Sequence, residues 1–281
     1  MQSSRLLMAG MVTGAVVLTA VIYLLPKNQP AEVKSAKPAI TAETGFDLKE
    51  YTEHAVAGLN QSFGSRYKEL KASEKAAGVQ PEAMSAFWDS AGVPGVAASY
   101  YEQIAGTNNK EESYLNAAYR YFDAYKSSRD SAESTYFSSK AIESYSKVLE
   151  LNPDNLNAKT DLGALYAEAT GEPMKGIMML REVVAADPNH ENAQLNLGFL
   201  SMRSGQFEKA LERFDKVLAI NPARIDMYIY RGEAMVQLGR KKEAIESFKI
   251  FRNLTSDKEM IENVDQYIAT LESTGTPEKK N

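Results

Sequence analysis

The chain has 281 residues, of which 44% are hydrophobic and 25% are charged, values typical of a globular domain. Its net charge of −5 gives no basic field for holding nucleic acid. The absence of cysteine excludes disulfides and thiolate nucleophiles, and two histidines are too few for a histidine-rich metal centre. No metal and no cofactor are therefore expected.

The first apolar segment predicts a membrane anchor within residues 1–25. Leu6 to Leu25 is a run of 20 residues without a charge, which as a helix would span roughly 30 Å. A cleaved signal peptide is the alternative, but the run is longer than a signal core and no small-residue cleavage site follows it. Gly10 and Gly14 have the GxxxG spacing, so a homodimer through these glycines is a hypothesis.

Residues 26–44 contain three prolines without apolar periodicity, which predicts a flexible linker between the apolar run and the rest of the chain.

The orientation of the predicted membrane anchor is not decided by its flanks. Basic residues lie on both sides of the apolar run, so the positive-inside rule leaves the orientation open. We favour a cytoplasmic N-terminus. The expected localisation is then a single-pass protein of the bacterial inner membrane, with the following domain in the periplasm. The opposite orientation would turn that domain toward the cytosol.

Residues 45–111 read as an irregular helical region with one degenerate helix pair. Apolar residues from Phe46 to Leu59 can share one helix face, and Gly64 and Gly78 punctuate the chain. The pair itself is predicted from Pro81 onward, with its break at residues 92–95. Its aromatic residues either cover the end of a helical stack or form a ligand-binding cluster: Trp88, Tyr100 and Tyr101.

The sequence then repeats itself at an interval of 34 residues. Seven positions return in register, with Gly198, Gly205, Ala210, Leu211, Glu212, Phe214 and Val217 recurring as Gly232, Gly239, Ala244, Ile245, Glu246, Phe248 and Phe251. This interval is typical of a solenoid of helix-turn-helix units. Small residues allow the two helices of a unit to approach closely, and prolines end the second helix: Pro153, Pro188 and Pro222.

These residues resemble the tetratricopeptide repeat family over about half of the chain. The resemblance implies an all-α, right-handed α-solenoid of antiparallel helix pairs. About four units are expected, at residues 112–154, 155–189, 190–223 and 224–256, with an enlarged turn from Lys126 to Glu133 in the first. A capping helix at 257–273 and a disordered tail at 274–281 follow. Three residues depart from the family pattern: Lys159, Gln194 and Ser256.

The same resemblance implies a concave groove, lined by the first helix of each unit, that receives peptides or helices of partner proteins. The residues placed on it are Asn157, Thr160, Asn192, Leu195, Asn196, Phe199, Met202, Arg203, Ile229 and Tyr230. Asparagine amides can bond to a peptide backbone, and the apolar residues offer an adaptable strip. Alternatively, the apolar residues only pack against the adjoining helices.

No nucleotide-binding, hydrolase, zinc-protease or calcium-loop motif occurs, so the chain is not expected to be an enzyme. Asp226 and Tyr230 stand where a carboxylate clamp would need cations, which disfavours binding of acidic chaperone tails. The expected function is a membrane-anchored adaptor that assembles an envelope complex through its groove. A self-associating structural membrane protein and a cytosol-facing receptor remain the alternatives.

Overall fold

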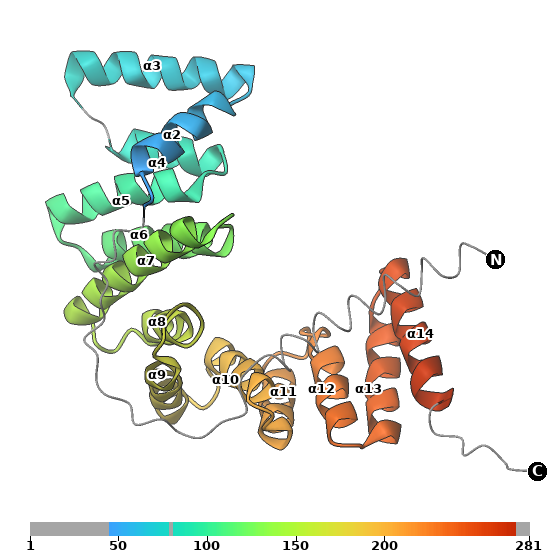
Figure 1. The fold of residues 1–281 in the computed structure, drawn as a ribbon. Coiled ribbons are helices and arrows are strands. Elements are labelled where there is room, and N and C mark those ends of the chain that lie inside the picture. The colour runs from blue at the N-terminus through green and yellow to red at the C-terminus, as the bar shows by residue number, and fades with distance from the viewer. Residues whose placement is uncertain (1–44, 79–80, 274–281) are drawn as a thin grey trace, which may run out of the picture. The chain divides into compact units, whose positions relative to one another are not determined.

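The computed structural model describes residues 45–78 and 81–273, and these form helices without any strand (Figure 1). The helices are α2 (Leu48–Ala57), α3 (Gln61–Ala77), α4 (Pro81–Ser90), α5 (Pro94–Asn108), α6 (Glu111–Lys126), α7 (Ser131–Leu151), α8 (Leu156–Ala169), α9 (Pro173–Ala186), α10 (Glu191–Arg203), α11 (Phe207–Ile220), α12 (Met227–Gln237), α13 (Lys241–Leu254) and α14 (Lys258–Ser273). They pack in chain order, which confirms the predicted α-solenoid. Its right-handedness stays a prediction.

Several predicted segments lie outside the described residues. These are the membrane anchor at 1–25 with Gly10 and Gly14, the linker at 26–44 and the tail at 274–281. Within residues 45–78 and 81–273, none of the helices combines the length and the apolar character needed to span a bilayer.

Four helix pairs, α6–α7, α8–α9, α10–α11 and α12–α13, follow one another from Glu111 to Leu254. The second helices of the first three pairs end at Leu151, Ala186 and Ile220. Each end lies two residues before a proline, as predicted. Gly205 and Gly239 turn the chain inside their units with φ near +70°, a conformation that glycine adopts without a steric penalty. The division of the chain into domains stays a prediction.

The enlarged turn expected from Lys126 to Glu133 is absent. Instead α6 ends at Lys126 and α7 begins at Ser131, and α7 runs for 21 residues, against 14 in α9 and α11. Asp130 starts α7 because its carboxylate accepts hydrogen bonds from the backbone N–H groups of Ala132 (2.8 Å) and Glu133 (2.9 Å). The additional residues of this unit therefore lengthen a helix and leave a short turn.

The region before the repeats holds four helices, α2 to α5. Gly64 does not break the chain as predicted, because it lies inside α3. Trp88 has no exposed surface and packs with Met84, Phe87 and Val96, so it belongs to a core cluster and is inaccessible to a ligand. Tyr100 and Tyr101 are half-buried against the same cluster.

Aromatic residues of α2 and of the segment just before it pack on the long helix α7. The Phe46 ring centroid lies 4.5 Å from that of Tyr136 and 5.1 Å from that of Phe137. Tyr51 lies 5.3 Å from Phe137 in an edge-on arrangement, a geometry that aromatic pairs favour. The start of the described chain is therefore anchored on the first repeat unit.

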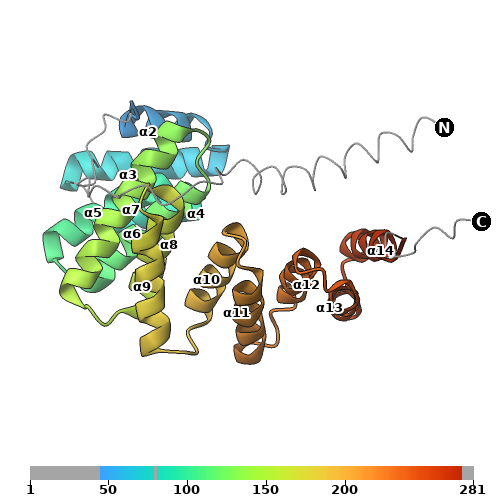
Figure 2. The same cartoon turned by 60° about the horizontal axis from the view of Figure 1, so that its bottom comes forward.

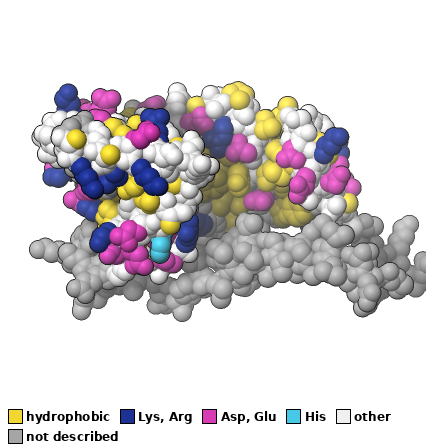
Figure 3. All heavy atoms as spheres, turned by 90° about the horizontal axis from the view of Figure 1, so that it is seen from above, with side chains coloured by type: hydrophobic (Ala, Val, Ile, Leu, Met, Phe, Trp, Pro, Cys, Tyr) yellow, Lys and Arg dark blue, Asp and Glu magenta, His cyan; other side chains and the backbone are white. Residues whose placement is uncertain are grey.

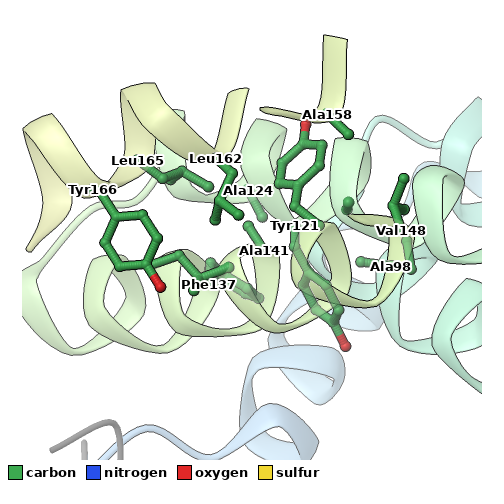
Figure 4. Packing of buried hydrophobic residues seen from close by; sticks show 14 residues of the cluster. Ala98, Tyr121, Ala124, Phe137, Ala141, Val148, Ala158, Leu162, Leu165 and Tyr166 are labelled. Carbon is green, nitrogen blue, oxygen red and sulfur yellow. The ribbon is translucent and has the colours of Figure 1, made fainter. Parts of the chain in front are cut away.

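Close backbone packing holds the helix pairs together. A Cβ atom on Gly176 would lie 2.2 Å from the carbonyl oxygen of Gly163, so α8 and α9 touch through their backbones. In the next unit Gly198 accommodates the Phe214 ring, and Gly232 accommodates Phe248 in the last. Neighbouring units then share apolar clusters; Figure 4 shows Leu162 and Leu165 of α8 meeting Ala124, Phe137 and Ala141 of the preceding pair.

The last described helix is α14, at the position where the sequence predicts a capping helix. Val264, Ile268 and Leu271 of this helix are buried against Phe248 and Phe251 of α13. Its other face carries charged residues that remain exposed. The helix thus covers the apolar side of the α12–α13 pair, as a terminal helix of a repeat array does.

Candidate protein-binding face

The residues predicted to line the groove come from the first helices of three successive units, α8, α10 and α12. Figure 2 shows these helices in chain order, with α10 between the α8–α9 pair and the α12–α13 pair. The name groove face is used here for the ten predicted residues: Asn157 and Thr160 on α8, Asn192, Leu195, Asn196, Phe199, Met202 and Arg203 on α10, and Ile229 and Tyr230 on α12.

The centre of the groove face is an aromatic cluster. The ring centroids of Phe199 and Tyr230 lie 4.7 Å apart with an interplanar angle of 86°, and Phe199 lies 5.6 Å from the buried Phe214. Leu195 and Met202 pack against the same cluster, and Ile229 packs on the neighbouring one. All five predicted apolar residues are half-buried, so each packs on its neighbours and also keeps accessible surface.

The three asparagines differ in how their amides are used. Asn157 Oδ1 lies 3.0 Å from His190 Nε2, which links α8 to the start of α10. Asn196 donates to the carbonyl oxygen of Asn192 (2.8 Å) inside α10. The exposed side chain of Asn192 has no hydrogen-bonding partner among the residues that the structure describes. Asn192 is therefore the asparagine with both amide groups available to a ligand.

Thr160 does not belong with the other nine residues. Its side chain has no exposed surface, and its hydroxyl donates to the carbonyl oxygen of Leu156 (2.8 Å). Ala164, one turn further along α8, is also buried. On α8 only Asn157 of the groove face is exposed, so most of the accessible groove face lies on α10 and α12.

Two carboxylates stand beside this face in poorly solvated positions. Burial raises the pKa of Asp161 to about 6, although the Tyr145 hydroxyl, which donates to it at 3.1 Å, acts in the opposite direction. Burial also raises the pKa of Glu233, which follows Tyr230 on α12. Arg203 is the single cation among the ten groove-face residues. The apolar centre of the groove face therefore has acidic neighbours.

Figure 3 shows hydrophobic side chains gathered in the hollow that this view opens between the N-terminal and the C-terminal helices. A hollow of this composition can hold apolar side chains of another chain, while nearby amides and carboxylates can accept hydrogen bonds from it.

Sequence reasoning missed a set of polar residues that brace this face. Gln194 is buried; its amide donates to the Pro188 carbonyl (2.7 Å) and accepts from Arg213 (2.6 Å). Arg224 pairs with both Glu191 (2.8 Å) and Asp226 (2.9 Å). The sequence signal was the polar residue at a position where the repeat pattern has a large apolar one, namely Gln194.

The arrangement defines a class of protein, a helical-repeat solenoid with a partly exposed apolar face. A family model described as tetratricopeptide repeat matches residues 169–228, which cover α9 to α11 and their flanks. Over these residues the chain carries tetratricopeptide repeat sequence, and at the general level its role is that of a protein-interaction scaffold.

Similarity to curated proteins is confined to part of the chain. The chain is 31% identical over 88 residues to the mitochondrial import receptor subunit TOM70 of Rattus norvegicus, which is 31% of this chain and 14% of that protein. It is 36% identical over 80 residues to the BBSome complex member BBS4 of Bos taurus, covering 28% and 15%. The chain thus matches about a seventh of the length of these relatives.

Solved structures share the fold. The crystal structure of a MamA protein matches with 23% identity and a TM-score of 0.50, covering 66% of this chain and 93% of that one. Residues 41 to the end of MamA from Desulfovibrio magneticus RS-1 match with 21% identity and a TM-score of 0.50, covering 70% and 96%. At these identities the likeness concerns the fold alone.

The predicted localisation, a single-pass protein of the bacterial inner membrane with a periplasmic repeat domain, is corrected by these findings. In the described part of the chain no helix is suited to spanning a membrane, and the relatives include a mitochondrial import receptor subunit. The prediction had relied on the apolar run from Leu6 to Leu25, which lies outside the described residues. The matched model describes a repeat, and the absence of enzymatic activity stays a prediction.

Proposed function

We propose that this chain is a scaffold that binds an extended or helical segment of a partner protein along its groove face. One observation carries the proposal. Leu195, Phe199 and Met202 of α10 and Ile229 and Tyr230 of α12 are half-buried, so they form a firm apolar strip that still has surface to cover. A strip that runs over two successive units suits a segment several residues long.

The chemistry around the strip restricts the partner. The Asn192 amide can pair with a peptide group of the bound segment through both its donor and its acceptor. Glu233 and Asp161 are poorly solvated carboxylates, so a segment that brings an anion toward them would be repelled. The segment that fits is apolar, with neutral or basic residues between its anchors.

The direct test is crosslinking from the centre of the strip. A photoreactive phenylalanine analogue replaces Phe199 and keeps its ring, and a control places the same analogue at the exposed Met260 of α14. We expect a partner to be captured from position 199 and not from position 260, with identification by mass spectrometry. If only a second copy of this chain is captured, the groove face serves self-association and the proposal is wrong. Equal capture from both positions would also contradict the proposal.

A matched pair of variants then tests the contact without disturbing the fold. Asn192→Ala removes an exposed amide that has no partner within the described residues, so stability should change by less than about 0.5 kcal/mol. Affinity for the captured partner should fall about fivefold to tenfold, because one hydrogen bond to a desolvated peptide group is lost. Asn189→Ala, an exposed asparagine in the preceding turn, is the control and should leave the affinity unchanged.

A further inference from the structure

A cleft of about 660 Å³ lies between α9, α10 and α11. Four apolar residues of α9 and α10 form its floor, and all belong to or pack on one cluster: Ile177, Val184, Leu197 and Leu200. Met174 stands at its rim with 59% of its surface exposed. The interior of this cleft is thus apolar and open to solvent.

The cleft lies on the opposite side of α10 from the groove face. Successive residues of an α-helix are separated by roughly 100° around the axis. Leu197, Leu200 and Ser204 therefore project about half a turn away from Leu195, Phe199 and Met202. A ligand in this cleft would occupy a surface that the proposed groove ligand does not touch.

The walls of the cleft are basic, and the term basic cleft refers below to this cavity with Arg181, Lys209 and Arg213. Glu212 is the one carboxylate among the lining residues. No described carboxylate lies within ion-pairing distance of any of the three cations; Lys209 donates to Gln206 and Arg213 to Gln194, which are both neutral. By contrast, Arg120, Arg224 and Arg231 are all paired with aspartate or glutamate.

Unpaired cations around an apolar floor are an unusual arrangement in a chain whose net charge is −5. Arg181 and Lys209 are exposed and Arg213 is partly buried, so positive charge stands beside accessible apolar surface and is complementary to an acidic ligand that also carries apolar side chains. We propose that the basic cleft is a second protein-binding site, which takes an acidic amphipathic segment of a partner. Its apolar side chains would enter the floor and its carboxylates would meet Arg181, Lys209 and Arg213.

The experiment measures binding of two synthetic peptides of equal length to the full chain by fluorescence anisotropy. Both peptides have leucine at helical spacing; one has glutamate and the other lysine at the remaining charged positions. We expect the glutamate peptide to bind, the lysine peptide not to bind, and the affinity to fall as salt is raised, because the ion pairs are partly exposed. Equal binding of both peptides, or binding of neither, would overturn the proposal.

Reversing the charge of two cations of the basic cleft tests whether the glutamate peptide binds there. Arg181 and Lys209 are exposed and lie on different helices, so the double variant R181E/K209E should fold normally. We expect its affinity for the glutamate peptide to drop at least about tenfold, since two attractive contacts become repulsive. The control is K68E/K242E, which reverses two exposed cations of α3 and α13 and should retain the affinity. Equal losses in the two double variants would contradict a site at the cleft.

Two further measurements distinguish binding of an acidic segment in the basic cleft from self-association and from binding at the groove face. If sedimentation equilibrium shows a dimer that R181E/K209E dissociates, the occupant is a second copy of this chain and the proposal is wrong. Asn192→Ala, on the groove face, should leave binding of the glutamate peptide unchanged. The two sites therefore fail independently in these experiments.

Discussion

Asp161 is a largely buried residue whose ionisation is unfavourable in this fold. Its carboxylate accepts one hydrogen bond, from Tyr145, and burial nevertheless raises its pKa to about 6. In the unfolded chain the group ionises near its usual pKa of about 4. Between these two values the folded state holds more protons than the unfolded state, so this residue makes stability fall as pH rises from about 4 to about 6.

The variant Asp161→Asn should remove this pH dependence while it keeps an acceptor for the Tyr145 hydroxyl. We expect the variant to gain stability relative to the parent between pH 4 and pH 7.5, by roughly 2 kcal/mol. Urea unfolding at the two pH values measures the difference. The exposed substitution Glu259→Gln on α14 is the control. A stability difference between variant and parent that is the same at both pH values would show that burial of Asp161 is unimportant.

At the scale of the helix pair, the close approach of α8 to α9 requires glycine at position 176. The space that a Cβ atom on Gly176 would need is taken by the carbonyl oxygen of Gly163 and the backbone nitrogen of Ala167. Both are main-chain atoms, so they cannot move aside as the end of a side chain can. Any residue larger than glycine must push the two helices apart.

Gly176→Ala is therefore expected to destabilise the protein by about 2 to 4 kcal/mol, measured as the change in the free energy of unfolding in urea. Gly64→Ala is the matched control, because Gly64 also lies in a helix but has no atom within 4 Å of its Cβ position. That substitution should stabilise by up to about 1 kcal/mol, as alanine favours helix. Equal effects of the two substitutions would be incompatible with a backbone contact between α8 and α9.

The helix pairs were predictable because small residues, aromatics and prolines recur in register, as Gly198 and Phe214 recur in Gly232 and Phe248. The extension of α7 was not predictable. Asp130 caps the helix through hydrogen bonds that only the structure shows, whereas in the sequence it is one of several polar residues. Likewise, glycine at position 64 suggests a helix end, but the neighbouring residues favour helix strongly enough for α3 to continue past it.

The candidate site was predictable in its position and not in its detail. The repeat register placed Phe199 and Tyr230 on one face, where the structure brings their rings together. It gave no indication that Thr160 is covered, because the repeat pattern does not specify which positions of a first helix the tertiary packing closes off. The basic cleft also escaped the sequence analysis, since Arg181 and Arg213 meet only through the packing of α9 on α10 and α11.

For the molecule as a whole, stability is distributed along a line of units that pack on their neighbours in sequence. In such an array a local defect weakens the nearest units and leaves distant ones intact. The capping helix α14 tests this property, because Ile268 inserts into the cluster of Phe248 and Phe251 while Ala269 faces solvent.

Ile268→Asp should loosen the C-terminal end alone, since it buries a carboxylate without a partner. Hydrogen exchange read by mass spectrometry is expected to become faster in α12, α13 and α14 and to stay unchanged in α4 to α7. Ala269→Asp, on the exposed side of the same helix, should have little effect anywhere. Faster exchange throughout the chain in the first variant would mean that the described helices unfold as one cooperative body.

The aromatic contact of α2 with α7 departs from this linear plan and bears on the order of folding. Phe46 meets Tyr136 and Phe137, about ninety residues further along the chain, whereas repeat neighbours are about 35 residues apart. Closing so long a loop costs more conformational entropy, and the receiving surface exists only after α7 has formed. During synthesis or refolding, the contact of Phe46 with α7 must therefore wait for the first repeat unit, and its formation is expected to be a late step.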